Sequence, residues 1–184
     1  MLVDRYGLAC RELANREGGA LRWSSLFRAL RLMELAGEVV AGYFFTGLSG
    51  PQFVPPSALM LMQSERPGPE DFWCNALDPI SPCGLGLDWP ELPQRRPNNH
   101  LAFHQGVLAL VIENQGKRLT FHLPPEHCER RGVLAPLAFL LARQRRVTIE
   151  SVNGVSARES AYLPALETVG RLVSDHRDSY LEAQ

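Results

Sequence analysis

The stretch LRWSSLFRALRLMEL, residues 21–35, decides the fold of the first third of the chain. Its apolar side chains recur every three or four residues and therefore share one helix face; they are Trp23, Leu26, Phe27, Leu30 and Met33. A shorter helix-compatible segment, 10–16, precedes it and is stopped by the pair Gly18-Gly19. The sequence predicts two helices joined by a turn, the second strongly amphipathic.

A hairpin is predicted immediately after these helices. Gly37 ends the long helix, residues 38–45 are rich in strand-forming Val, Tyr and Phe, and residues 52–54 form a second short strand. The segment between them, residues 47–51, is composed of turn residues. Two helices followed by such a hairpin indicate a winged helix, with 21–35 as the recognition helix and 47–51 as the wing tip.

Four side chains are candidates for nucleic-acid contact in this module: Arg22, Arg28, Arg31 and Tyr43. The three arginines lie mostly off the apolar stripe, and Tyr43 lies near the wing. The alternative interpretation is that the arginines form the solvated face of an amphipathic helix.

The rest of the chain predicts a second module of a different kind. Residues 57–63 suggest one more helix, and the proline- and glycine-dense segment that follows, with Trp73 and Trp89, indicates an ordered connector. The overall prediction is an α+β fold: a winged helix over 1–66, the connector over 67–97, a β-rich, barrel-like module with a packed helix over 98–173, and a flexible tail over 174–184.

Within the second module, strands are predicted over 101–103, 107–112, 118–121 and 147–152. Residues 114–116 indicate a hairpin loop in which Gly116 takes a positive φ. The very apolar segment 126–145, interrupted by Pro136, predicts a helix that packs across the sheet, and 162–172 predicts a last helix.

Composition restricts the classes of function. The 184 residues are 45% hydrophobic and 21% charged, and no apolar run is long enough to span a membrane. Asp4 stands where a secretion signal needs basic residues, so we expect a cytoplasmic protein. A net charge of −1 argues against extensive phosphate binding, although five arginines without an acid between 130 and 146 predict a local basic surface.

Cofactor motifs are missing from the sequence. The four cysteines form no CxxC pair, which favours buried reduced thiols, and His122, His127 and Cys128 do not complete a metal-ligand set. The sequence contains no GxxxxGK[ST] loop and no DExH box, so this segment is expected to bind neither ATP nor magnesium.

An ordered set of motifs resembles a known family, the large helicase-related (Lhr) type of superfamily-2 helicases. The motifs are VDRYG at 3–7, GYF at 42–44, GLSGPQF at 47–53, LDPISPCG at 77–84, DWP at 88–90, and VNG at 152–154 with Leu163 and Leu166. The resemblance extends to about Leu172. One departure is Ala41, because family members often carry a basic residue there.

The resemblance implies the closing winged helix and β-barrel of a longer DNA-repair helicase, whose ATP and magnesium sites lie elsewhere in the parent chain. Its expected partners are DNA (duplex, forked or single-stranded), the other domains of the parent, and further copies in an oligomer.

Three functions are compatible with these observations. The first is a DNA-binding module without catalysis, and the second is an oligomerisation or docking cap, suggested by the apolar segment 133–141. The third is part of a base-excising glycosylase, which would need a carboxylate beside a base pocket. The available acids are Glu38, Asp78, Asp88 and Glu91, and Asp78 before Pro79 is better explained as a turn-former.

Overall fold

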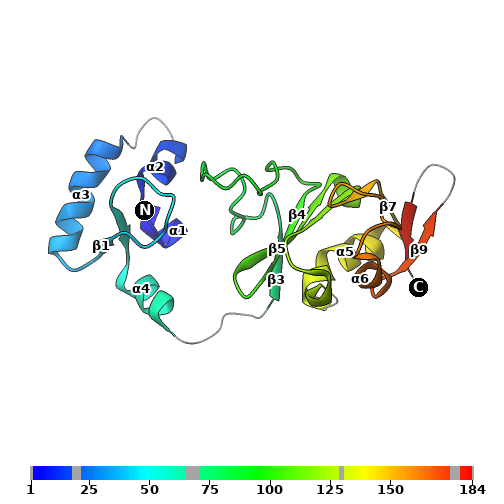
Figure 1. Ribbon diagram of the computed structural model, residues 1–184. Helices are drawn as coiled ribbons and strands as arrows, with labels where there is room; N and C mark the ends of the chain where they lie inside the picture. The colour runs from blue at the N-terminus through cyan, green and yellow to red at the C-terminus, as the bar shows by residue number, and fades with distance from the viewer. Residues whose placement is uncertain (1, 18–21, 65–70, 129–130, 175–178, 184) are drawn as a thin grey trace. The chain divides into compact units, whose positions relative to one another are not determined.

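The computed structural model describes residues 2–17, 22–64, 71–128, 131–174 and 179–183 (Figure 1). Its internal contacts divide the chain into two compact units: the N-terminal unit, Met1–Arg66 with Gly84–Pro90, and the C-terminal unit, Pro67–Cys83 with Glu91–Gln184. Helices and strands occur in both units, which confirms the predicted α+β class. Within the described ranges, no helix is long and apolar enough to cross a lipid bilayer.

The N-terminal unit consists of helices around a small hairpin. Its elements are α1 (Leu2–Tyr6), α2 (Arg11–Glu17), α3 (Trp23–Leu35), β1 (Val40–Gly42), β2 (Gln52–Val54) and α4 (Pro56–Gln63). β1 and β2 are antiparallel, and Ala9 pairs with Phe53 on the other side of β2 through two backbone hydrogen bonds of 2.8 and 2.9 Å. The predicted helices and hairpin are therefore confirmed.

The apolar stripe of α3 packs against this core. Leu30 is buried, and Trp23, Leu26, Phe27 and Met33 pack against the buried cluster that includes Phe53. Gly37 follows the helix with φ of +76°, and the N–H of Glu38 donates to the carbonyl of Met33, which satisfies one of the last carbonyls of α3.

The C-terminal unit is built on a five-stranded sheet. The strands are β3 (Asp71–Asn75), β4 (His100–His104), β5 (Val107–Glu113), β6 (Arg118–Phe121) and β8 (Ser151–Val152), in the order β3-β4-β5-β6-β8. The neighbours are antiparallel except β6 and β8, which are parallel. The short 3₁₀ turns η1 (Asn114–Gly116) and η2 (Pro125–His127) follow β5 and β6, and Gly116 has φ of +103°, as predicted.

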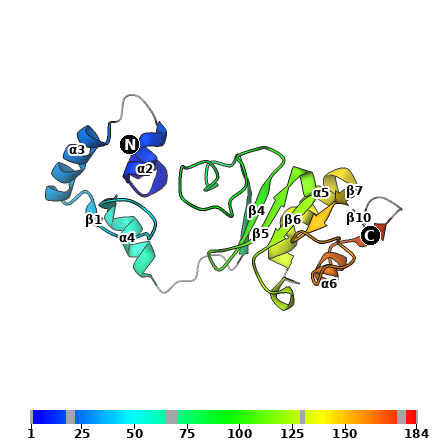
Figure 2. The same ribbon diagram turned by 45° about the horizontal axis from the view of Figure 1, so that its top comes forward.

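Helix α5 (Arg131–Gln144) covers this sheet as the sequence predicted. It contacts β3, β4 and β5, and both views draw it beside these strands (Figure 1 and Figure 2). Val133, Leu134 and Leu137 of α5 are almost fully buried in the same core as Leu110 and Ile112 of β5. The apolar excess of this segment is thus covered by the unit itself.

A separate three-stranded sheet contains β7 (Arg146–Ile149), β10 (Ser179–Glu182) and β9 (Arg171–Ser174), with β10 in the centre and antiparallel to both neighbours. The prediction of a flexible tail over 174–184 is therefore wrong for residues 179–182. Leu181 is fully buried, and Glu182 pairs with Arg146 at 2.6 Å, so side-chain burial and two rows of backbone hydrogen bonds order this segment.

The predicted last helix is shorter than expected. α6 comprises Leu163–Glu167, and residues 171–174 are strand β9 instead. The predicted strand 147–152 is likewise divided, since β7 belongs to the smaller sheet and β8 to the larger one. In the part of the chain that the structure describes, both sheets are open, and the barrel expected from the resemblance is not found.

The predicted connector, 67–97, contributes to both units. Asp71–Asn75 form β3 and pair along their whole length with β4, whereas Leu85 packs against the core of the N-terminal unit. In the C-terminal unit, Arg95 donates to the carbonyl oxygens of Leu77 at 2.8 Å and Cys83 at 3.2 Å. These bonds hold the loops on either side of residues 84–90 together.

Candidate nucleic-acid interface

The long helix of the N-terminal unit is held by aromatic contacts along its inner face. The ring centroids of Trp23 and Phe27 are 5.9 Å apart, and Phe27 meets Phe53 of β2 edge-on at 5.7 Å. These contacts fix the rotation of α3 about its axis. The opposite face of the helix is consequently presented to solvent.

All three candidate arginines are exposed, with different surroundings. Arg22 is the residue that precedes the first turn of α3 and makes no side-chain capping bond, while Arg31 forms an ion pair with Glu34 one turn later. Arg28 lines an open pocket of about 420 Å³ together with Arg11 of α2, Trp23, Ser24 and Pro51. Two guanidinium groups beside one recess attract a phosphate group.

Arg11 was missed by the sequence analysis. It begins α2, and the contact between α2 and α3 is a tertiary one that no helical periodicity in the sequence displays. A basic residue at the start of the first helix of a helix-turn-helix could have served as a signal. The structure therefore adds Arg11 to the candidate contacts.

The wing is organised by the buried side chain of Gln52. Its Oε1 accepts the backbone N–H groups of Phe44 and Phe45 at 2.9 and 2.8 Å, and its Nε2 donates to the carbonyl of Phe45 at 2.8 Å. The amide thus takes the place of a strand partner where β1 has ended. Tyr43, at the base of this loop, is 80% exposed.

A second contact holds the far part of the wing to α2. The carboxylate of Glu12 accepts the backbone N–H of Ser49 at 2.9 Å and its hydroxyl at 2.5 Å. Burial of Glu12 opposes ionisation, but these two hydrogen bonds outweigh it and lower the pKa of the carboxyl below its usual value. The wing is therefore held by hydrogen bonds at Phe44 and Phe45 and again at Ser49.

The four predicted residues come from two elements of one unit. Arg22, Arg28 and Arg31 belong to the exposed face of α3 and its first cap, and Tyr43 belongs to the wing. The basic surface over 130–146 is less uniform than the sequence predicted. Arg130 and the side chain of Arg131 lie outside the described residues, Arg143 stands 5.5 Å above the ring of Phe139, and Arg146 is paired with Glu182.

The acids considered for catalysis are dispersed. Glu38, Asp88 and Glu91 are exposed, whereas Asp78 lines a pocket of the C-terminal unit. Oδ1 of Asp78 accepts the N–H of Ile80 at 3.1 Å, which confirms its predicted role in a turn. Among the described residues, no three His, Cys, Asp or Glu side chains gather in a way that could hold a metal ion.

The predicted state of the cysteines is confirmed: Cys10, Cys74, Cys83 and Cys128 are buried free thiols. Burial raises the pKa of Cys74 and of Cys128 to about 11. These thiols are therefore protonated at neutral pH and are poor nucleophiles and metal ligands.

The arrangement of α2, α3 and the β1–β2 hairpin, with Ala9 as the third strand position, is that of a winged-helix domain. Residues 1–73 match the family model of the winged-helix domain of the large helicase-related protein.

Two curated proteins are similar to most of the chain. One, named Lhr helicase/probable uracil glycosylase, from Mycolicibacterium smegmatis, is 27% identical over 170 residues, covering 85% of this chain. The other, named Lhr helicase/uracil glycosylase, from Escherichia coli, is 26% identical over 184 residues, covering 92% of this chain. The chain spans 11% and 12% of the lengths of these two relatives.

Proposed function

We propose that this chain is a non-catalytic DNA-binding module at the C-terminal end of an Lhr-type ATP-dependent helicase that acts in DNA repair. The winged-helix fold and the names of the two relatives support this proposal. The small share of each relative that the chain matches is consistent with a motor, with its ATP and magnesium, elsewhere in the parent protein. DNA and the other domains of the parent are its proposed partners.

The observation that carries the proposal is the pocket beside the start of α3. Arg28 and Arg11 line it together with Ser24, and Trp23, Phe27 and Pro51 form the rest of its lining. In winged helices the first residues of the recognition helix approach the DNA. A backbone phosphate at this pocket would meet two cations and the positive end of the α3 dipole.

The double variant Arg11→Ala, Arg28→Ala is expected to bind duplex DNA about tenfold more weakly than the unaltered chain at low salt. Each lost phosphate contact should also reduce the slope of log affinity against log salt concentration by about 1. Fluorescence anisotropy at several salt concentrations measures both quantities. Arg31→Ala should have a smaller effect, because Glu34 already neutralises part of that charge.

The control is Arg158→Ala, which removes one positive charge, where the double variant removes two, from an exposed position of the C-terminal unit. If the double variant and the control have the same affinity and salt slope, α3 is not the DNA-binding face. Undetectable binding of the unaltered chain to duplex, forked and single-stranded DNA would refute the proposal as a whole.

A second candidate function is a docking or oligomerisation cap. The apolar segment 133–141 that suggested it is mostly buried in its own core, but α3 exposes Leu32 at 69% and Leu35 at 83%. These two leucines share a helix face with Arg28 and Arg31. Apolar side chains with such large exposed fractions favour contact with another protein surface.

Light scattering separates this candidate from simple DNA binding. If α3 docks on a second copy, the mean mass should rise with concentration, and Leu32→Ser, Leu35→Ser should abolish the rise while sparing the affinity of Arg11 and Arg28 for DNA. A constant monomer mass at high concentration would exclude self-association.

The names of the relatives include uracil glycosylase, and excision of a base needs a carboxylate or an activated water beside the base. Of the four candidate acids, Asp78 lines the pocket of the C-terminal unit, and its carboxylate accepts the N–H of Ile80. The proposal accordingly includes no catalytic role for this chain.

A further inference from the structure

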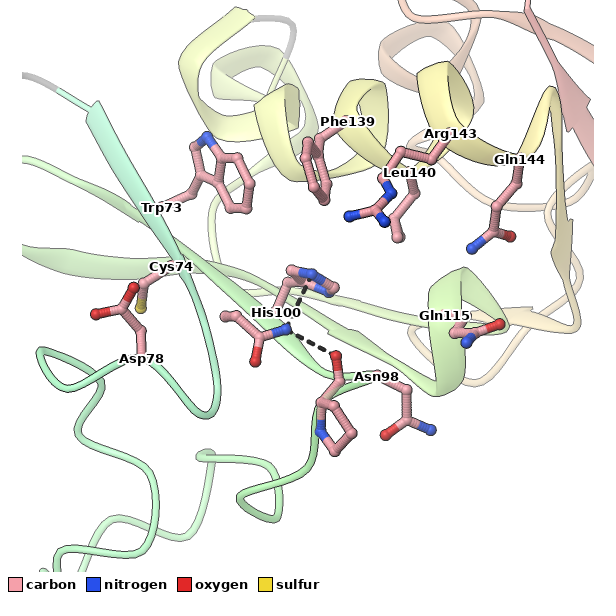
Figure 3. Close-up of a pocket in the computed structure, with 12 residues that line it drawn as sticks. Trp73, Cys74, Asp78, Asn98, His100, Gln115, Phe139, Leu140, Arg143 and Gln144 are labelled. Carbon is pink, nitrogen blue, oxygen red and sulfur yellow. Dashed lines mark hydrogen bonds between the residues drawn. The ribbon is translucent and has the colours of Figure 1, made fainter.

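A pocket of about 660 Å³ in the C-terminal unit lies between α5 and the strands β3 and β4 (Figure 3). Trp73 of β3, His100 of β4 and Phe139 of α5 contribute aromatic rings to it, and Arg143 of α5 contributes a cation. Its volume is typical of sites for small organic molecules. All four side chains belong to the C-terminal unit.

The aromatic rings form a contiguous wall. The centroid of Trp73 is 5.1 Å from that of Phe139 and 6.0 Å from that of His100, and His100 and Phe139 are 6.3 Å apart. Phe139 is 37% exposed, although Val133, Leu134 and Leu137 of the same helix are buried. An exposed ring at the mouth of an aromatic pocket offers a face on which a flat ligand can stack.

The hydrogen bonds of Asn75 determine which nitrogen of His100 carries the proton. Nδ2 of Asn75 donates to the carbonyl of Pro97 at 2.8 Å, and its Oδ1 accepts the N–H of Leu77 at 2.9 Å, so the orientation of the amide is fixed. The second Nδ2 hydrogen points to Nε2 of His100 at 3.1 Å (Figure 3). Nε2 must therefore accept, and in a neutral imidazole the proton is on Nδ1.

Burial lowers the pKa of His100, which keeps its ring neutral near pH 7. The side chain is only 4% exposed, and its Nδ1–H has no hydrogen-bond partner among the described residues. A buried donor without a partner is unfavourable, and because Nδ1 itself is buried, an acceptor atom of a ligand reaches it only after the side chains around it shift. His100 thus selects for a carbonyl oxygen or an unprotonated ring nitrogen.

The remaining lining groups narrow the class of ligand. The guanidinium of Arg143 lies 5.5 Å above the ring of Phe139, and Asn98, Gln115 and Gln144 add amide donors and acceptors. Such a set fits a flat, uncharged heterocycle with carbonyl and N–H groups, joined to an anionic group near Arg143. This is the chemistry of a nucleobase in a nucleotide.

We propose that this pocket binds one unstacked nucleobase, which stacks on Phe139 and Trp73 and accepts a hydrogen bond from Nδ1 of His100, while Arg143 contacts the adjoining phosphate. The proposal rests on the proposed function, because a DNA-bound chain is what would supply such a base at a strand end, fork or gap.

The test compares single-stranded oligo(dT) with an abasic oligomer of the same length and charge, using fluorescence anisotropy. The unaltered chain should bind oligo(dT) about tenfold more tightly, since stacking and the His100 bond require a base. Phe139→Ala should abolish this preference, and Phe139→Leu, which retains apolar bulk without the ring, should abolish most of it. Phe139→Tyr should keep it.

Arg143→Ala should weaken binding of both oligomers equally, whereas the control Arg158→Ala should change neither. All of these substitutions are at exposed positions, and circular dichroism verifies that the variants are folded. A saturable change in tryptophan fluorescence on titration with thymidine monophosphate would show that the free nucleotide also enters the site. No change would restrict the ligand to a base within a strand.

Equal affinity for oligo(dT) and the abasic oligomer, unaltered by Phe139→Ala, would overturn the nucleobase site. That outcome would leave the duplex binding assigned to Arg11 and Arg28 untouched. Conversely, an Arg11→Ala, Arg28→Ala variant that loses duplex binding but keeps its preference for oligo(dT) over the abasic oligomer would show that the two sites act independently.

Discussion

Replacing Gly116 by alanine is expected to lower the free energy of unfolding of the C-terminal unit by about 4 kcal/mol, since overpacking and backbone strain each cost about 1–3 kcal/mol. A β-carbon at this position would lie 2.1 Å from Cγ1 of Val147, which is buried in the core. The residue also has φ of +103°, a conformation that side chains other than hydrogen strongly disfavour. Denaturant unfolding followed by circular dichroism measures the change.

Gly106 provides the matched control. Its φ is +80°, but a β-carbon there would have no atom within 4 Å, so Gly106→Ala should cost about 1–2 kcal/mol from backbone strain alone. Adding Val147→Ala to Gly116→Ala should recover part of the loss by making space, although it removes apolar burial. Equal destabilisation by the two glycine variants would show that the close approach to Val147 is absent.

Replacing Gln52 by leucine is expected to destabilise the N-terminal unit by about 3 kcal/mol, because it leaves several buried polar groups without partners. Gln52 is fully buried and makes three hydrogen bonds to the backbone of Phe44 and Phe45. Leucine has a similar volume, so the loss is one of hydrogen bonding rather than of packing. Thermal unfolding reports the stability, and amide hydrogen exchange at Phe44 and Phe45 should accelerate.

Gln63→Leu is the control for this change, since Gln63 is exposed at the end of α4 and its replacement should alter stability by about 0.5 kcal/mol or less. Gln52→Glu keeps the acceptor for the two N–H groups but places a buried negative charge against the carbonyl of Phe45. If Gln52→Leu unfolds at the temperature of the unaltered chain, the amide does not hold the wing.

Local patterns were sufficient to predict α2, α3 and the hairpin of the N-terminal unit, but not helix α1 or the pairing of Ala9 with Phe53. The periodicity of Trp23, Phe27 and Leu30 is a property of a single helix, and the turn residues between 47 and 51 shape a hairpin through their own backbone preferences. The exposed arginines of α3 followed from the same periodicity. The family resemblance added the identity of this module, which the match over residues 1–73 confirmed.

Long-range pairing was harder to predict. Residues 179–182 contain one aliphatic side chain, Leu181, in a polar setting, and their order depends on strands and on Arg146 far away in the sequence. The bonds from Asn75 to Pro97 and His100 likewise join residues that no local pattern relates, so the aromatic pocket was not predicted. Arg11 was not predicted for the same reason, because its proximity to Arg28 depends on the tertiary fold.

The central place of β10 between β7 and β9 has a consequence for biosynthesis. β10 follows both neighbours in the sequence, so neither can complete its backbone pairing until residues 179–182 have left the ribosome. During that interval the growing chain presents two unpaired strand edges and the cavity that Leu181 later fills. Chaperones recognise such features, and the same features lead to aggregation. We expect the C-terminal unit to acquire its structure after translation of this segment rather than during it.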